Sequence, residues 1–268
     1  MKASLIITTY NRPDALEVVL ESALRQSFRD FEIIIADDGS KDETKNIIEK
    51  FQEKSKIKII HSWHEDIGFR AAMSRNRAVA KATGEYLIFI DGDMVLDKDF
   101  ILNHLEVAKR GVFIQGGRVL LDKTLTKEVL KTKEISFSLF QKGIKNRKNM
   151  IKSKTFSKIF SKYTTSLRGI KTCNFALFRE DFFRVNGFDN RFIGWGREDS
   201  EFAVRLLNSG IKRKNLKFLA IAYHLWHQEN SRESLPKNDK RLQKTIEEKL
   251  TWAEDGVDRF LRGKEWKK

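Results

Sequence analysis

The sequence predicts an α/β fold in which a mostly parallel central sheet carries helices on both faces. Apolar runs at residues 4–9, 31–36, 57–60 and 86–90 have the continuous hydrophobic pattern of strands that are buried on both sides. Segments with helical spacing separate these runs. This alternation favours parallel strands that are joined by right-handed crossovers.

The elements of the first half have recognisable ends. Pro13 follows the first strand and begins a helix with apolar positions 16, 19, 20, 23 and 24. The second strand ends at Asp37-Asp38-Gly39-Ser40, where Ser40 or Asp42 is expected to cap the next helix. An alanine-rich helix at 70–82 precedes the strand at 86–90, which ends at Asp91-Gly92-Asp93.

The second half has weaker signals. We expect helices at 99–109, 200–209 and 240–261, and strands at 112–115, 119–121, 172–178 and 216–222. We find neither an internal repeat nor a linker. The sequence therefore predicts a single nucleotide-sugar-binding domain over residues 1–230, with a basic insertion at about 125–170, and a C-terminal helical extension over 231–268.

Composition limits the function classes. The 268 residues include 52 Lys and Arg against 37 Asp and Glu, which gives a net charge of +15 and favours an anionic partner. The single cysteine, Cys173, excludes an intramolecular disulfide. The N-terminal apolar run is too short for a signal peptide, and no run reaches the length of a membrane span. We expect a cytoplasmic protein, either free or peripheral on the inner face of the membrane.

The stretch from Ile135 to Arg179 contains no acidic residue, and apolar positions are interleaved with its lysines and arginines. Two interpretations fit this pattern equally. It could be a solvated pair of basic helices packed on the core, or a basic amphipathic surface for an anionic membrane or acceptor.

Three pairs of carboxylates follow predicted strands or lie in loops: Asp37 and Asp38, Asp91 and Asp93, and Glu198 and Asp199. Because the ends of parallel strands share one rim of a sheet, these pairs can converge. Asp91 and Asp93 would form a hard oxygen site suited to Mg²⁺ or Mn²⁺ held together with substrate phosphates. Gly-rich dinucleotide and P-loop motifs are absent after the first strand.

An ordered set of motifs resembles the family-2 glycosyltransferases of the GT-A fold. It comprises residues 4–11, 31–40, Arg75-Asn76 and 84–93. Gly194-Trp195-Gly196-Arg197-Glu198-Asp199 and His224-Leu225-Trp226-His227 are similar to acceptor and metal motifs of β-1,4-galactosyltransferases and bacterial chondroitin-type polymerases. The resemblance covers roughly residues 3–230.

The resemblance implies an inverting, metal-dependent transferase that uses a UDP-sugar. The acceptor would be a glycan or lipid-linked glycan of the bacterial surface polysaccharide or lipooligosaccharide type, and the product β-linked. The metal would be Mn²⁺ or Mg²⁺, and imidazole ligands would favour Mn²⁺. The implied nucleotide-binding residues are Thr8, Tyr10, Asn11, Asp37, Asp38, Arg75 and Asp91, and the implied metal ligands are Asp93, Asp91, His224 and His227.

The same resemblance implies that Asp199 is the catalytic base, because glycosyl transfer requires the acceptor hydroxyl to lose its proton. Glu198, Trp195 and Gly196 would bind the acceptor, with the indole stacking on a sugar face. Two alternatives are a basic nucleic-acid-binding protein and a nucleotidylyltransferase. No recognition motif supports the first, so a nucleic-acid partner is not expected. The second would require a Gly-rich basic loop after the first strand, where Thr8-Thr9-Tyr10-Asn11-Arg12 stands instead.

Overall fold

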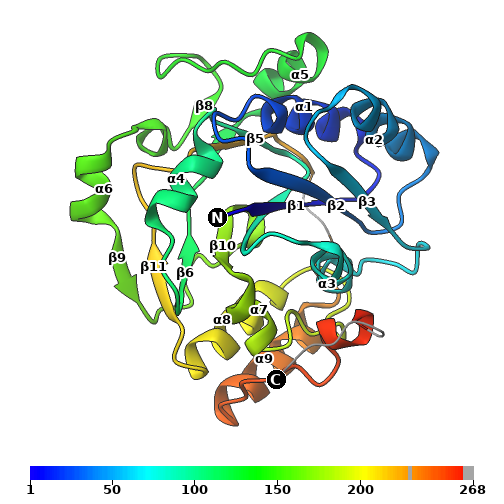
Figure 1. The fold of residues 1–268 in the computed structure, drawn as a ribbon, viewed down its shortest axis with the longest axis vertical. Helices are drawn as coiled ribbons and strands as arrows, with labels where there is room; N and C mark the ends of the chain where they lie inside the picture. Colours follow the sequence, from blue (N-terminus) through cyan, green and yellow to red (C-terminus); the bar gives the residue numbers. More distant parts are fainter. Residues whose placement is uncertain (229–230, 262–268) are drawn as a thin grey trace.

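A computed structural model describes residues 1–228 and 231–261 (Figure 1). Its larger sheet has the strand order β3-β2-β1-β4-β10-β6-β11-β9. In that order the strands are Ile59–Trp63, Phe31–Asp37, Ala3–Thr9, Tyr86–Asp91, Phe175–Phe178, Val112–Gln115, Lys212–Asn215 and Lys162–Thr164. The first four strands are mutually parallel, β6 and β11 are parallel, and β10 and β9 run antiparallel to their neighbours. The expected α/β fold with a mostly parallel sheet is confirmed.

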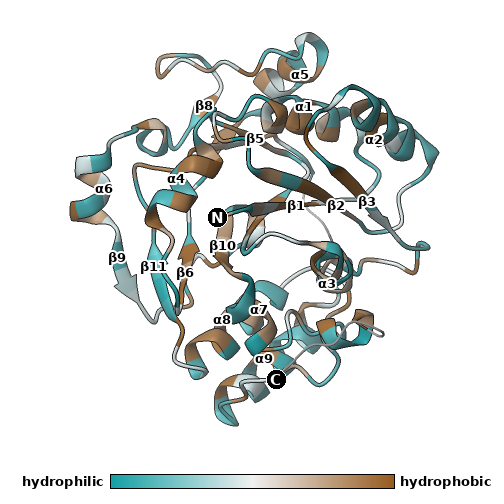
Figure 2. Cartoon of the chain, viewed as in Figure 1, coloured by the Kyte–Doolittle hydropathy of each residue, from teal (hydrophilic) through white to brown (hydrophobic). Residues whose placement is uncertain are grey.

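The sheet is covered on both faces, as its buried strands require. Leu5 and Ile7 of β1 pack into one core cluster with α1 (Pro13–Leu24), α2 (Asp42–Lys54) and α4 (Phe100–Val107). Ile6 packs on the opposite face with α3 (Ala71–Lys81), α7 (Arg179–Arg184) and α8 (Glu198–Asn208). Figure 2 shows the hydrophobic colour concentrated on the strands between these helices. Successive residues of a strand point to opposite faces, so the continuous apolar runs serve both layers.

A smaller sheet lies beside α1 and has the order β5-β12-β7-β8. Its strands are Met94–Leu96, Ala222–His224, Val119–Leu121 and Ile144–Lys145, and α5 (Lys123–Thr132) packs with them. Ala15 and Val18 of α1 join this third core cluster. The backbone N–H of Leu225, just after β12, donates to the carbonyl of Asp93 at 2.9 Å. The small sheet therefore brings the end of β12 to the turn after β4.

The acid-free stretch does not form a pair of helices. It contains β8, a 3₁₀ turn at Arg147–Met150, the short helix α6 (Lys154–Phe160) and β9 at the edge of the large sheet. Within residues 1–228 and 231–261, no helix has the length and apolar character needed to cross a membrane.

Three predicted elements of the second half have other bounds in the structure. The strand predicted at 216–222 is replaced by β11 and β12, because Phe218 and Ala220 between them have left-handed backbone with φ of 62° and 49°. The segment 172–178 begins with a 3₁₀ turn before β10. The helix predicted at 240–261 is α9 (Leu235–Glu247), with a proline in its first turn, and Lys249 just beyond it has φ of 49°.

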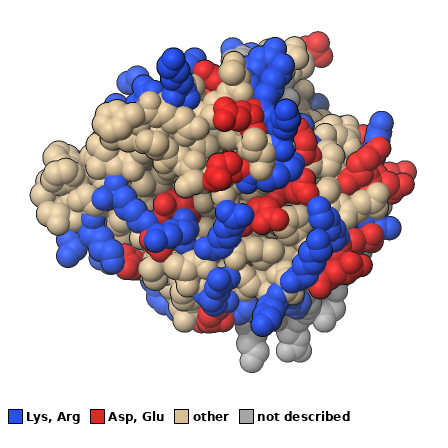
Figure 3. Space-filling model, turned by 90° about the horizontal axis from the view of Figure 1, so that it is seen from above, with Lys and Arg blue, Asp and Glu red and all other residues tan. Residues whose placement is uncertain are grey.

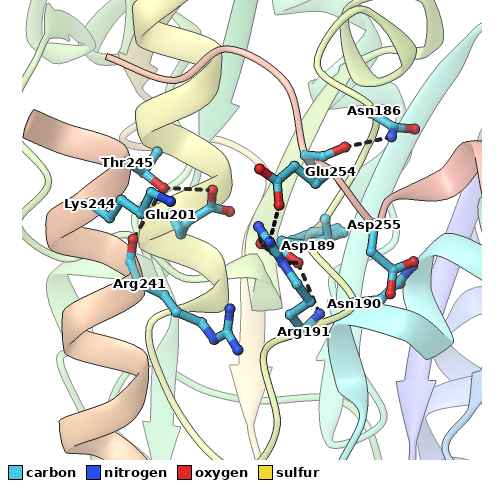
Figure 4. A network of polar contacts seen from close by, with 12 residues as sticks. Asn186, Asp189, Asn190, Arg191, Glu201, Arg241, Lys244, Thr245, Glu254 and Asp255 are labelled. Carbon is cyan, nitrogen blue, oxygen red and sulfur yellow. Dashed lines mark hydrogen bonds and ion pairs between the residues drawn. The ribbon is translucent and has the colours of Figure 1, made fainter. Parts of the chain in front are cut away.

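The C-terminal segment packs on the domain through polar contacts, some of which Figure 4 shows. Thr245 of α9 donates to Glu201 of α8 at 3.1 Å, and Glu201 forms a buried pair with Arg205 at 2.7 Å. Asn190 donates to Asp255 at 2.9 Å. The boundary between a domain and an extension at residue 230 stays a prediction, and residues 262–268 of that extension lie outside the described residues.

Candidate active site

Arg75 of α3 lies at the centre of the carboxylates that follow β4 and begin α8. Its guanidinium is 3.2 Å from Asp91, 3.4 Å from Glu198 and 3.6 Å from Asp199, and its Nε donates to Thr8 Oγ1 at 3.1 Å. The side chain is 6% exposed. The structure therefore brings the Glu198 and Asp199 pair together with Asp91 around one buried cation.

The charges around Arg75 change the pKa values of the groups in this cluster. Burial alone would lower the pKa of Arg75, but Asp199, Asp91 and Glu198 together raise it above its ordinary value. The pKa of Glu198 is raised to about 7, first by burial and then by the negative charge of Asp199. The raised pKa favours the protonated form of Glu198, which can donate a hydrogen bond.

Asp199 is held by the segment that precedes β10. Its two carboxylate oxygens accept hydrogen bonds from the backbone N–H of Thr172 at 3.0 Å and from the Thr172 hydroxyl at 2.8 Å. Its side chain is 22% exposed, compared with 11% for Glu198. The carboxylate is therefore oriented by the protein while it stays accessible to a second reactant.

Trp195 precedes α8 on a loop with unusual backbone. Gly194 and Gly196, on either side, have φ of 73° and 101°, and Arg197 has φ of 78°. The indole is 37% exposed and lies 5.6 Å from the Arg232 guanidinium. Trp195 is thus a surface aromatic beside the carboxylates of α8, where a sugar ring could stack on it.

Asp93, His224 and His227 form a candidate metal site. Their ligand atoms lie within 4.8 Å of one another, and Asp93 Oδ2 is 3.6 Å from His224 Nε2 and 3.4 Å from His227 Nε2. Burial, with smaller contributions from Arg118 and His227, lowers the pKa of His224 to about 3, so its imidazole is neutral and able to ligate. The second carboxylate oxygen of Asp93 is buried without a hydrogen-bond partner among the described residues. One carboxylate and two imidazoles fit a divalent transition metal.

Asp91 is oriented differently from Asp93, although only Gly92 separates them. Asp91 bonds to Arg75, and the backbone N–H of Gly92 donates to the carbonyl of Thr8 at 2.7 Å. A Cβ at position 92 would meet that carbonyl at 3.0 Å. The tight contact between β1 and this turn directs the two carboxylates to different partners. Metal ligation by Asp91 stays a prediction.

Asp37 and Asp38 lie buried at the end of β2, on the same rim. Asp37 accepts a hydrogen bond from the N–H of Ser40 at 2.8 Å and contacts His61 Nε2 at 2.8 Å. Asp38 accepts one from the N–H of Arg70 at 2.8 Å. Both carboxylates thus shape the loops at this rim of the sheet through their internal contacts.

The predicted nucleotide-binding residues of the first loop lie next to them. Asn11 has φ of 48°, and its side chain accepts a hydrogen bond from the N–H of Lys41 at 2.9 Å. Tyr10 is 47% exposed and donates to Asp66 at 2.9 Å. The loops after β1 and β2 are therefore joined to each other, and Tyr10 projects from them into solvent.

His64 is a residue of this region that sequence reasoning missed. Its Nδ1 is 2.7 Å from the carbonyl oxygen of Glu65, and its Nε2 is 3.1 Å from Asp38 Oδ1. The contact with Asp38 is an ion pair by distance and not a hydrogen bond, and it favours the charged form of the ring. Asp38 is the main cause that raises the pKa of His64. The available signal was the pair His61 and His64 after the third strand.

Comparison with known proteins gives a consistent family. The model of glycosyl transferase family 2 matches residues 4–186, and that of the N-terminal domain of galactosyltransferase matches residues 154–228. A chondroitin synthase of Escherichia coli is 29% identical over 82% of this chain, which spans 34% of that protein. A Campylobacter jejuni GalNAc(5)-diNAcBac-PP-undecaprenol β-1,3-glucosyltransferase is 29% identical over 65% of this chain and 55% of that protein.

Among solved structures, Staphylococcus aureus TarS 1–349 in complex with UDP-GlcNAc superposes with a TM-score of 0.62 at 18% identity. The match covers 97% of this chain and 70% of that one. It confirms the expected GT-A type of fold. The chain spans about a third to about half of the length of the two relatives described above.

Proposed function

The chain belongs to glycosyl transferase family 2, and from this premise we propose that it is an inverting, metal-dependent glycosyltransferase. It moves a hexose or N-acetylhexosamine from a UDP-sugar to a hydroxyl group of a glycan or glycolipid. The observation that carries this proposal is the convergence of Asp91, Asp93, Glu198 and Asp199 with two histidines and Arg75 on one rim of the sheet.

The donor half of the proposal rests on the loops after β1 and β2. Thr8, Tyr10, Asn11 and Asp38 would bind the uridine, with Asp37 and His64 holding the loops in place. A carboxylate can accept a hydrogen bond from a uracil N–H, which discriminates between bases. The UDP-GlcNAc bound to TarS, a protein of the same fold, supports a UDP-sugar as donor.

Asp93, His224 and His227 would hold Mn²⁺, or Mg²⁺ in its place. A bound divalent ion would neutralise the charge that develops on the leaving diphosphate. Asp91 and Arg75 lie beside this triad and fix its position relative to α8 through their ion pair.

In the reaction, an acceptor oxygen forms a bond to the anomeric carbon while the bond from that carbon to the UDP oxygen breaks, and UDP leaves with the electron pair. Asp199 takes the proton of the acceptor hydroxyl, oriented by Thr172. Glu198, with a pKa of about 7, hydrogen-bonds the acceptor, and Trp195 stacks on its sugar. One displacement inverts the anomeric centre, so an α-linked donor gives a β-linked product.

The acceptor class is a growing glycan, either free or carried on a lipid. The names of the relatives, a chondroitin synthase and a transferase that acts on an undecaprenol-linked glycan, support this class. A lipid-linked acceptor would place the enzyme at the cytoplasmic face of a membrane.

A UDP-release assay tests the proposal. The protein is incubated with a panel of UDP-sugars and Mn²⁺, with and without candidate glycan acceptors. We expect one donor to give UDP release that increases with acceptor, and excess EDTA to abolish it. Full turnover in EDTA would refute metal dependence, and the absence of UDP release with every donor would refute the choice of a UDP-sugar.

A further inference from the structure

An exposed apolar patch lies at the β9 edge of the large sheet. Phe156 and Phe160 of α6 and Phe218 contact one another, with ring centroids 5.7 to 6.1 Å apart. Phe156 is 48% exposed, Phe160 46%, and Ile159 of the same helix 59%. We call these four residues the edge patch. In Figure 3 the left end of the molecule, where α6 lies in Figure 1, shows uncharged atoms bordered by lysines and arginines.

The turn at Phe218, which holds the edge patch in place, has an energetically unfavourable backbone conformation. Phe218 has φ of 62°, a conformation that a bulky side chain rarely adopts. Its carbonyl accepts a hydrogen bond from the N–H of Ser153, the residue that caps α6, at 2.9 Å. The strained turn and the helix are therefore fixed to each other, and together they present aromatic rings to solvent.

A basic pocket of about 540 Å³ adjoins the edge patch, and residues of the paired strands β9 and β11 contribute to its lining. Its lining includes Phe160 of the patch and four cationic side chains, and it contains no carboxylate. The cations are Lys162, Arg168, Arg213 and Lys217. Such a lining is complementary to an anion.

Arg213 is the most informative of these cations. It is 3% exposed, and its guanidinium donates to the carbonyls of Ser166 and Arg168. Within the described part of the chain, its Nε has no hydrogen-bond partner and no carboxylate pairs with it. Burial lowers its pKa. A buried cation without a counter-charge favours an anionic ligand in the adjoining pocket.

The lysines of this region divide into two groups. Lys152 pairs with Asp97 and Asp99, and Lys154 pairs with Glu106, so their charges are already balanced. Lys158, Lys162 and Lys217 are exposed and make no ion pair with any described residue. The unbalanced charge therefore lies beside the edge patch and the pocket.

We propose that the edge patch and the basic pocket dock this protein on an anionic phospholipid bilayer. The four apolar side chains lie at the boundary between headgroups and acyl chains, and the pocket receives a lipid phosphate. Ile159, on the same helix as two of these rings, adds aliphatic surface that can enter the boundary between headgroups and acyl chains. This inference rests on the proposed function, because docking on a bilayer would bring the enzyme to a lipid-linked acceptor.

Sedimentation with vesicles tests the proposal without any sugar donor, so its failure is distinct from failure of the proposed activity. The protein is mixed with vesicles of phosphatidylcholine alone, or of equal parts phosphatidylcholine and phosphatidylglycerol. We expect binding to the anionic vesicles only. Lys158→Gln, Lys162→Gln and Lys217→Gln combined should weaken partitioning on the order of 100-fold, from about 1 kcal/mol per lysine near a charged surface.

Matched variants separate the proposal from its alternatives. Lys54→Gln, Lys56→Gln and Lys58→Gln combined remove the same charge at the opposite edge of the sheet, and they should leave partitioning nearly unchanged. Equal weakening by both triple variants would refute a localised surface. Ile159→Ser should also weaken binding by several-fold, while Ile246→Ser on α9, another exposed isoleucine, should not.

Two further outcomes would overturn the proposal. The first is unchanged binding by Ile159→Ser, which would mean adhesion by charge alone. The second is release of the protein from vesicles by millimolar glycerol phosphate, which would mean that the pocket takes a free phosphate. All substituted residues in these variants are exposed, and circular dichroism checks that each variant is folded.

Discussion

Replacing Arg75 by methionine removes the cation that three carboxylates share and keeps a side chain of similar length. Arg75 is 6% exposed and lies 3.2 to 3.6 Å from Asp91, Glu198 and Asp199. Removing one partner of a buried ion pair costs about 3–5 kcal/mol, because the remaining charge is left without compensation. Asp91 and Asp199 are partly exposed, so we expect the lower end of that range at pH 8.

The pH dependence of this cost tests its cause. Arg75 lowers the pKa values of Asp91 and Glu198, so without it these values rise in the folded state, while their values in the unfolded chain stay the same. A raised folded-state pKa means that the folded protein binds protons more readily than the unfolded chain. The variant should therefore regain stability as the pH falls, so its deficit relative to the wild type shrinks between pH 8 and pH 5.

Urea unfolding at both pH values measures these free energies, with Arg77→Met on the same helix as the control. Arg77 makes no ion pair within the described residues and lies 5.4 Å from the ring of Phe260. Its substitution should have a small effect, with only a minor pH dependence through His64, whose pKa Arg77 lowers slightly. A loss of stability by Arg75→Met that is identical at pH 5 and pH 8 would refute the electrostatic explanation and leave only the loss of shape and hydrogen bonds.

Four further predictions concern individual side chains. Asp199→Asn should lower transfer by ~10²–10⁴ in kcat with donor binding intact, because proton removal develops in the transition state. Glu198→Gln should act more on the acceptor KM, and near-normal kcat in Asp199→Asn would instead make Glu198 the base. His224→Ala should weaken Mn²⁺ binding at least tenfold by isothermal titration calorimetry, and unchanged affinity would remove it from the site. The pKa of His64 is raised, so its stabilising pair with Asp38 is fully present below the unfolded value near 6.5 and lost as the pH rises through the folded value. His64→Gln should therefore destabilise the protein more at pH 6 than at pH 9 in urea unfolding, and a deficit equal at both would exclude the imidazolium.

The first half of the fold was predictable because its local signals agree. Continuous apolar runs and a proline at the first helical position all point to the same elements. The second half was not, because tertiary contacts decide it. Lys212–Asn215 is a charged sequence that forms β11 between two strands, and the apolar run after it turns through left-handed residues.

The candidate site could be located from sequence but its internal contacts could not. The sequence predicted that carboxylates after strands would meet, and Asp91, Glu198 and Asp199 do meet around Arg75. The orientation of each site side chain depends on contacts between segments that are distant in sequence. One example is the hydrogen bond from the Thr172 hydroxyl to Asp199. The raised pKa of His64 depends on its contact with Asp38, which no local sequence pattern predicts.

The metal triad joins parts of the chain that are far apart in sequence. Asp93 follows a strand of the large sheet, whereas His224 ends the strand β12 of the small one. A backbone cut near Phe140, which is 89% exposed, would put Asp93 in one fragment and both histidines in the other. Neither fragment would hold the full ligand set, so affinity for Mn²⁺ would report their reassembly. If the chain were divided there, recovery of Mn²⁺ binding would therefore show that the two fragments had associated into the native fold.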